Sequence, residues 1–279
     1  MEDYPHLVEN VVRIFDFQVP EMLVESFHAE DTLRYNEAWF YLADSTVFQI
    51  FSFEFLQGDP QTALQQPNTI VITESTARKY FGEAQPLGQT LRLEELVDMK
   101  VTGVIRDLPA QSHMKIDLLG SLSTYRMLQG RQMPDQLLGP LTRYRQTKLN
   151  QYPETWVWNP CWTYVLLRPG VQQSELENHF KDFYRTHYTE LSNQNVTLYL
   201  QPLTDIHLHS DHAFEMQKNS DISYVYILSM IALVILFLAS INFMNLTTAT
   251  SFTRAREIGM KKVFGGTPEK LIYQFLGET

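Results

Sequence analysis

The residues best suited to chemistry lie in the segment HLHSDH, which contains four potential metal ligands: His207, His209, Asp211 and His212. In an extended strand, His207 and His209 would share one face, and Asp211 or His212 could complete a metal site. The alternative is a polar strand end and turn in which the histidines are solvated, and the sequence favours this interpretation. We therefore predict no metal site and no cofactor.

The sequence contains none of the common catalytic signatures. It has no Gly-Lys pair, so it lacks the G-x-x-x-x-G-K-[ST] phosphate-binding loop. It also lacks the H-E-x-x-H helix, the G-x-S-x-G turn and the G-x-G-x-x-G loop. Cys161 is the only cysteine, and its apolar surroundings indicate a packed thiol rather than a nucleophile. We therefore predict that the chain is not itself an enzyme.

Charge divides the 279 residues unevenly. The whole chain carries −10, residues 224–246 carry no charge, and residues 247–279 carry a net +2, which leaves −12 on residues 1–223. No basic patch recurs along this large acidic part, which argues against nucleic acid as a partner.

The uncharged segment YVYILSMIALVILFLASINFMNL, residues 224–246, predicts a transmembrane helix. At 1.5 Å per residue, about 20 residues cover the roughly 30 Å of a bilayer's hydrocarbon core. Tyr224 and Tyr226 stand at one end, as in an aromatic belt, and the basic residues 254–262 follow the other end. The positive-inside rule then places residues 1–222 outside and the C-terminus in the cytoplasm, with the membrane helix at residues 223–248.

Two amides, Asn242 and Asn245, lie near the cytoplasmic end of the predicted helix. Amides in a bilayer usually face another helix, which would indicate a partner span. The alternative is that both lie in the wet interface, and the sequence leaves the two interpretations open.

The part before the membrane predicts an α+β fold. Residues 70–72 indicate a buried strand, Thr73 an N-cap and Gly82 the end of a short helix. Strands follow around Leu91 and Leu93 and at residues 101–105, which gives a strand–helix–strand–strand order. Further along, the sequence predicts a short helix and a long loop at 120–159, a strand at 161–170, one helix over 174–188 and one or two strands over 195–209.

Aromatic side chains are dense in YPETWVWNPCWTY, which suggests either a platform for peptide or lipid or, more simply, packing between sheet and loop. They are Tyr152, Trp156, Trp158, Trp162 and Tyr164.

After the membrane helix, helical spacing continues to Gly265-Gly266, which is a natural stop. Thr267 and Pro268 then suit the N-cap and first position of another helix. The basic residues could simply attract an anionic membrane surface. Alternatively, the glycine pair could form a docking element for a cytoplasmic protein, since close backbone contact favours glycine.

The segment INFMNLTTATSFTRAREIGMKKVFGGTPEKLIYQFLGE resembles MacB/FtsX-type ABC transporter permeases. The segment FYLADSTVFQIFSFEFLQGDPQTALQQPNTIVITESTARKYFGEAQPLGQTL resembles the MacB-like periplasmic core domain. The resemblance implies a two-lobed, mixed-sheet periplasmic domain over residues 1–222 and an inner-membrane location. It also implies a cytoplasmic coupling helix and the start of the next permease helix over residues 249–279.

The resemblance implies a function in which the chain couples ATP hydrolysis by a separate cytoplasmic subunit to export or extrusion of peptides, antibiotics or lipoproteins. The implied partners are that ATP-binding subunit, a second permease copy, membrane lipid and a periplasmic or outer-membrane protein. The implied coupling residues are Arg256, Glu257, Ile258, Gly259, Lys261, Lys262, Val263, Gly265 and Gly266.

Permeases of this type have four spans, so we expect the chain to be the middle part of a longer protein. The rival hypothesis is a single-span membrane sensor or adaptor with an extracytoplasmic ligand-binding domain.

Overall fold

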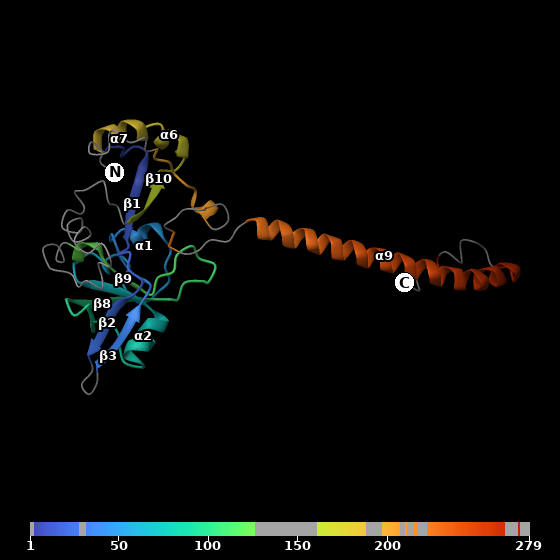
Figure 1. Cartoon of the computed structure of the whole chain (residues 1–279), viewed down its shortest axis with the longest axis horizontal. Helices are drawn as coiled ribbons and strands as arrows, with labels where there is room; N and C mark the ends of the chain where they lie inside the picture. Colours follow the sequence, from blue (N-terminus) through green and yellow to red (C-terminus); the bar gives the residue numbers. More distant parts are fainter. Residues whose placement is uncertain are drawn as a thin grey trace. The chain divides into compact units, whose positions relative to one another are not determined.

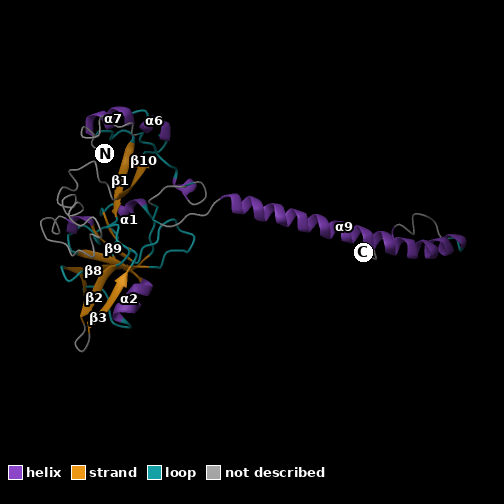
Figure 2. Cartoon of the chain, viewed as in Figure 1, coloured by secondary structure: helices purple, strands orange, loops and turns teal. Residues whose placement is uncertain are grey.

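The computed structural model describes residues 3–27, 32–125, 161–187, 197–206, 210, 215–216, 222–265 and 273. These residues form two compact units, one within residues 1–218 and the other comprising mainly residues 219–279. Figure 2 shows strands and short helices in the first unit and a single long helix in the second.

The first unit is built on one mixed sheet, which contains ten strands among the described residues. The main order is β10-β1-β4-β9-β6-β8-β7-β2-β3, with β5 paired to β8. The pairs β4–β9 and β6–β8 are parallel, and the other pairs are antiparallel. The strand bounds are β1 Val8–Phe15, β2 Met22–Phe27, β3 Thr32–Glu37, β4 Phe40–Ala43, β5 Phe55–Gly58, β6 Thr69–Thr73, β7 Thr90–Leu93, β8 Val97–Ile105, β9 Leu118–Ser121 and β10 Cys161–Leu167.

The helices of the described residues are mostly short. They are α1 Val47–Ile50, α2 Glu74–Phe81, α6 Gln173–Glu177, α7 Phe180–His187, α9 Ile222–Val263 and the 3-10 turns η1 Leu122–Thr124 and η4 Leu203–Asp205. The mixed sheet with helices confirms the predicted α+β class.

Alternation along the strands gives the sheet a core on each face. In β6, Ile70 and Ile72 belong to one hydrophobic cluster, with α2, and Val71 belongs to the other, with Val47 of α1. A third, smaller cluster joins one end of β1 and β10 to α6 and α7. Figure 1 shows these four elements together at one end of the unit, as a small second lobe on the same sheet. The expected two lobes are therefore present.

The predicted strand–helix–strand–strand order is confirmed by β6, α2, β7 and β8. Thr73 accepts a hydrogen bond from the backbone N–H of Thr76 as the N-cap of α2, and Gly82 ends this helix with φ +57°. Leu91 and Leu93 are both buried, as their shared face predicts.

Two predicted elements of the small lobe are wrong. The single helix predicted over 174–188 divides into α6 and α7, because the N–H of His179 bonds to the carbonyl of Leu176 in a tight turn. The described part of the predicted strand over 195–209 contains no strand: residues 197–202 are irregular, and η4 and the helical residue Ile206 follow. Both polar backbone groups of Leu200 are bound by side chains of α6: its N–H donates to Glu177 and its carbonyl accepts from Gln173.

Candidate functional site

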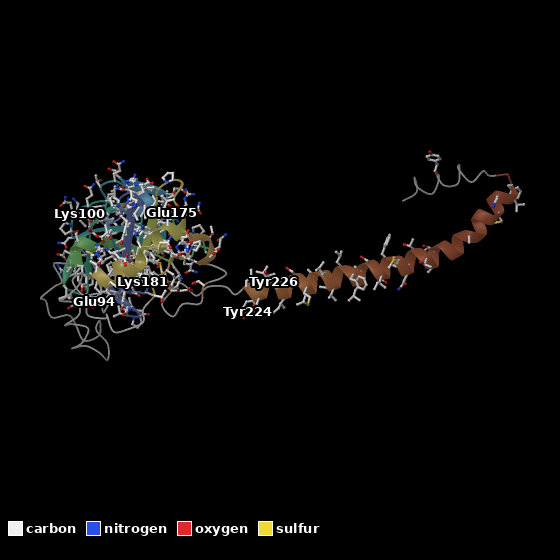
Figure 3. The ribbon with its side chains drawn as sticks, turned by 90° about the horizontal axis from the view of Figure 1, so that it is seen from above. Glu94, Lys100, Glu175, Lys181, Tyr224 and Tyr226 are labelled. Atoms are coloured by element: carbon white, nitrogen blue, oxygen red, sulfur yellow. The ribbon has the colours of Figure 1, made fainter. Side chains whose placement is uncertain are left out.

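Helix α9 contains the predicted membrane segment. Among the residues that the structure describes, Ile222–Thr250 is the one stretch of helix long and apolar enough to cross a membrane, and none of it is buried. Its 29 residues span about 43 Å at 1.5 Å per residue, more than the roughly 30 Å that a bilayer core needs. Figure 3 shows Tyr224 and Tyr226 at the start of this helix.

The polar side chains of the apolar segment fall into two kinds. The hydroxyls of Ser240, Thr247 and Thr248 each donate to the carbonyl four residues earlier, at 2.8 Å. The amides of Asn242 and Asn245 are exposed, and the described residues offer them no hydrogen-bond partner. The hydroxyls are therefore satisfied within α9, whereas the amides are not.

The predicted coupling residues Arg256 to Val263 all lie within α9, which continues without a break from the apolar segment to Val263. The side chains of Arg256, Glu257, Ile258 and Lys261, and all of Gly266, lie outside the described part. Lys262 and Val263 are exposed on the last turn.

The predicted helix stop at Gly265 is confirmed. Gly265 has φ +91°, its N–H donates to the carbonyl of Lys262 at 3.2 Å, and the N–H of Phe264 donates to Met260 at 3.1 Å. In the Schellman pattern two hydrogen bonds close a helix C-terminus, and the bond from Gly265 to Lys262 is the one that spans fewer residues. Positive φ favours glycine here because a side chain would strain the backbone.

Gly259 differs from Gly265, because its backbone is ordinary helix and a Cβ atom added to it would meet nothing within 4 Å. Nothing in the described chain therefore requires glycine at this position. If glycine is needed there, the requirement comes from outside the described residues.

Sequence reasoning missed one feature of this helix end. Met260 and Phe264 were not among the candidate residues, yet they are 58% and 88% exposed and extend the apolar surface of Val263, which is 85% exposed. The expected change from membrane helix to coupling helix, at residues 248 and 249, lies within the unbroken α9 and stays a prediction. The absence of glycine and proline between residues 222 and 258 is the sequence signal for this continuity.

The structure does not test the chemistry-bearing residues singled out first. His207, His209, Asp211 and His212 lie outside the described residues, and within the described ranges no group of three or more His, Cys, Asp or Glu is placed to hold a metal ion. Cys161 packs partly against the core, as expected.

Trp162 and Tyr164, the two described residues of the aromatic segment, do not form an exposed platform. The Trp162 ring lies 5.5 Å from that of Tyr41, and the Tyr164 ring lies 5.0 Å from that of Phe51, both centroid to centroid. Burial also raises the pKa of Tyr164 above its usual value. These two rings are packing residues, and Tyr152, Trp156 and Trp158 lie outside the described residues.

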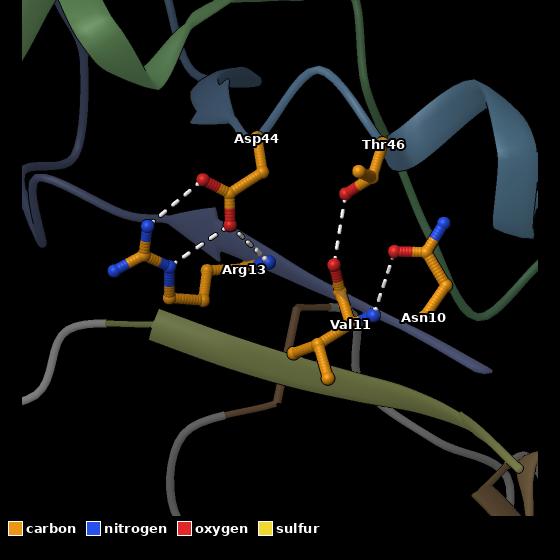
Figure 4. Close-up of polar contacts among 5 residues, drawn as sticks. All are labelled: Asn10, Val11, Arg13, Asp44 and Thr46. Atoms are coloured by element: carbon orange, nitrogen blue, oxygen red, sulfur yellow. Dashed lines mark hydrogen bonds and ion pairs between the residues drawn. The ribbon is translucent and has the colours of Figure 1, made fainter. Parts of the chain in front are cut away.

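A polar clamp holds β1, which belongs to both lobes. Asp44 accepts hydrogen bonds from the backbone N–H of Arg13 at 3.0 Å and from its guanidinium at 2.9 Å through each carboxylate oxygen (Figure 4). The hydroxyl of Thr46 donates to the carbonyl of Val11 at 2.8 Å. These bonds fix β1 to the segment between β4 and α1.

A second polar group lies where β3 meets α2. The buried carboxylate of Glu37 accepts from the hydroxyl of Tyr80 at 2.5 Å and from Nζ of Lys79 at 2.7 Å. Burial and the bond to Glu37 raise the pKa of Tyr80 far above its usual value. The phenol stays neutral at physiological pH, so this group is a structural donor rather than an acid or base.

Comparison with known protein families gives two matches. The family model of the MacB-like periplasmic core domain matches residues 2–183, and that of the FtsX-like permease C-terminal region matches residues 229–279. A comparison with curated proteins gave no match.

Solved structures similar to the chain come from permeases and transporters. A domain of a protein assigned as a permease from Porphyromonas gingivalis is 26% identical, with 64% of this chain and 70% of that one covered, at a TM-score of 0.45. The periplasmic region of MacB from Actinobacillus actinomycetemcomitans is 13% identical, with coverages of 69% and 78% and a TM-score of 0.41. The extracellular domain of the noncanonic ABC-type transporter YknZ from Gram-positive bacteria is 16% identical, with coverages of 43% and 58% and a TM-score of 0.32.

Proposed function

The chain belongs to the MacB/FtsX-like family of ABC transporter permeases, and from this premise we propose that α9 couples a cytoplasmic ATP-binding subunit to movement of the outer domain. In this proposal the chain resides in the inner membrane, with residues 1–222 in the periplasm and the C-terminus in the cytoplasm. ATP is hydrolysed by the separate subunit, and the cargo belongs to the peptides, antibiotics or lipoproteins that the resemblance implied.

The observation that carries the proposal is the continuity of α9. Its 42 residues correspond to about 63 Å of helix, roughly twice the thickness of a hydrocarbon core. Gly259 is its only glycine, and it contains no proline. A push on the C-terminal turn would therefore move the apolar segment as one body, because no residue typical of a kink interrupts it before Gly259.

The C-terminal turn of α9 has the character of a docking surface. Met260, Val263 and Phe264 are apolar and exposed, and Lys262 adds a positive charge beside them. Central apolar anchors with charged neighbours are the usual composition of a protein contact. The positive-inside rule supports a cytoplasmic position for this turn.

Helical phase provides the test. In the permease complex with its ATP-binding subunit, one alanine inserted after Thr250 rotates the C-terminal turn by about 100° and shifts it by about 1.5 Å relative to the membrane segment. Four inserted alanines bring the turn back to within about 40° of its original direction and shift it by about 6 Å.

We expect the single insertion to abolish the permease-dependent stimulation of ATP hydrolysis and the fourfold insertion to restore part of it. Thr250→Ala, which changes the same position without insertion, is the matched control and should keep the stimulation. Equal stimulation with the single insertion and with the control would overturn the proposal of a rigid coupling helix.

A further inference from the structure

We propose that Met216 anchors the start of α9 to the main sheet of the outer domain. The proposal rests on the proposed function, because a helix that transmits movement needs a firm attachment to the part that it moves. Among the described residues between α7 and α9, Met216 is the only one that is buried, with 7% of its surface exposed. Glu215 and Met216 belong to no helix or strand, so the buried side chain, rather than sheet pairing, holds this segment.

Met216 belongs to the hydrophobic cluster on the α1 face of the sheet. The other buried residues of the cluster come largely from α1 and from the strands β1, β4, β6, β8 and β9. Replacing a buried methionine by a small residue typically weakens its packing at least about thirtyfold. Strand β1 also reaches the small lobe through Val8, and the bonds between Arg13 and Asp44 clamp it. A pull on Met216 therefore acts on the strand that both lobes share.

The length of the connecting chain decides which attachment is loaded first. Six residue steps lead from Met216 to Ile222, the first residue of α9, and they span at most about 20 Å. The attachment before Met216 is Leu200, whose backbone is held by Glu177 and Gln173 of α6. The 22 steps from Leu200 to Ile222 reach about 75 Å. A displacement of α9 therefore tightens the connection to Met216 long before the connection to Leu200.

The test measures how widely the start of α9 ranges relative to the main sheet, in the full chain in phosphatidylcholine bilayers. Spin labels are attached at Leu56→Cys, exposed on β5, and at Tyr224→Cys on α9, after Cys161→Ala removes the native thiol. The measured quantity is the width of the distribution of distances between the two labels. A flexible chain of 22 residues spans about twice the r.m.s. distance of one of six. Met216→Ser should therefore widen the distribution about twofold, whereas Met216→Leu, which nearly conserves the apolar volume, should leave it unchanged.

A second variant leaves the core intact and changes only the length of the connection. Six glycine and serine residues are inserted between residue 221 and Ile222. With Met216 as the anchor, the connection grows from about six to about twelve residues, and the distribution should widen about 1.4-fold. With Leu200 as the last attachment, the same insertion would widen it only about 1.1-fold, and this result would overturn the proposal.

Two controls separate release of the anchor from loss of the fold. A label pair within the outer domain, at Leu56→Cys and Leu166→Cys, should give the same distribution with Met216→Ser as without it. If that pair changes, the inserted connection alone decides. Glu177→Ala removes the acceptor of the Leu200 N–H and should leave the distribution between positions 56 and 224 unchanged.

An unchanged distribution in Met216→Ser would overturn the proposal, and so would a widening in Glu177→Ala as large as that in Met216→Ser. The measurement contains no ATP-binding subunit, so its failure would leave the coupling role of the C-terminal turn of α9 untouched. Loss of the coupling role in the alanine-insertion experiment would likewise leave the width of the distribution as it is.

Discussion

The two glycines at the end of α9 should respond to substitution in opposite ways. Gly265 adopts φ +91°, where an L-residue is strained, whereas Gly259 is an ordinary helical position with open space around it. Gly265→Ala should therefore destabilise the turn that ends α9. Gly259→Ala should stabilise the free helix, since alanine is the better helix former.

The expected magnitudes are similar in size and opposite in sign. A left-handed conformation costs an L-residue about 1 kcal/mol, which lowers the population of the closed turn about fivefold. Replacing glycine by alanine inside a helix gains up to about 1 kcal/mol. Hydrogen exchange, measured on the full chain in detergent, should accordingly be about fivefold faster at the amides of residues 264 and 265 in Gly265→Ala, and slower around residue 259 in Gly259→Ala.

Measuring how strongly the variants stimulate ATP hydrolysis by the separate subunit then distinguishes an effect on helix stability from the loss of a contact with that subunit. If that subunit packs closely on α9, Gly259→Ala should lower stimulation even though it stabilises the helix, because the new methyl group occupies space that only a partner needs. Unchanged exchange in Gly265→Ala would refute the argument from positive φ. Full stimulation by Gly259→Ala, and also by the larger Gly259→Leu, would show that no partner approaches this position.

Three predictions concern the outer domain, each measured by urea unfolding of the full chain in detergent. Asp44→Asn should lower the free energy of unfolding by about 1 kcal/mol, because charge-assisted bonds to the partly exposed Arg13 are weakened. Tyr80→Phe should cost about 1–3 kcal/mol, since buried Glu37 loses a donor, and a change below a few tenths would contradict this role. Burial first, and then the charge of Glu37, raise the pKa of Asp117. The stability linked to its protonated form is therefore lost as pH rises through the folded-state pKa. Asp117→Asn should be more stable than the unsubstituted chain at pH 7, and this advantage should disappear in acid.

Elements governed by local backbone rules could be predicted from the sequence. Thr73 and Gly82 mark the two ends of α2 because an N-cap hydroxyl and a positive φ each select a few residue types. Gly265 was predictable for the same reason. The buried face of β7 follows from simple alternation of Leu91 and Leu93.

Elements decided by distant contacts could not be predicted in this way. The segment around Leu200 has the alternation of a strand, but side chains of α6 take both of its backbone bonds. Glu177 benefits from the same arrangement, because the N–H of Leu200 and then the amide of Gln173 lower the pKa of its carboxyl. The pairing of β1 with β10, about 150 residues later, likewise has no local signal.

The membrane boundary expected at residues 248 and 249 stays a prediction, because composition changes there and the backbone does not. Charges begin only at Arg254, whereas main-chain bonding continues to the end of α9, as the helical spacing of the sequence indicates. Thr247, Thr248 and Thr250, which stand at this boundary, all return their hydroxyls to carbonyls one turn earlier. Such bonds compete with the helix's own pairing and often bend it. The proposal of a rigid coupling helix therefore requires that these bonds leave α9 straight, and the residue inserted after Thr250 tests that requirement.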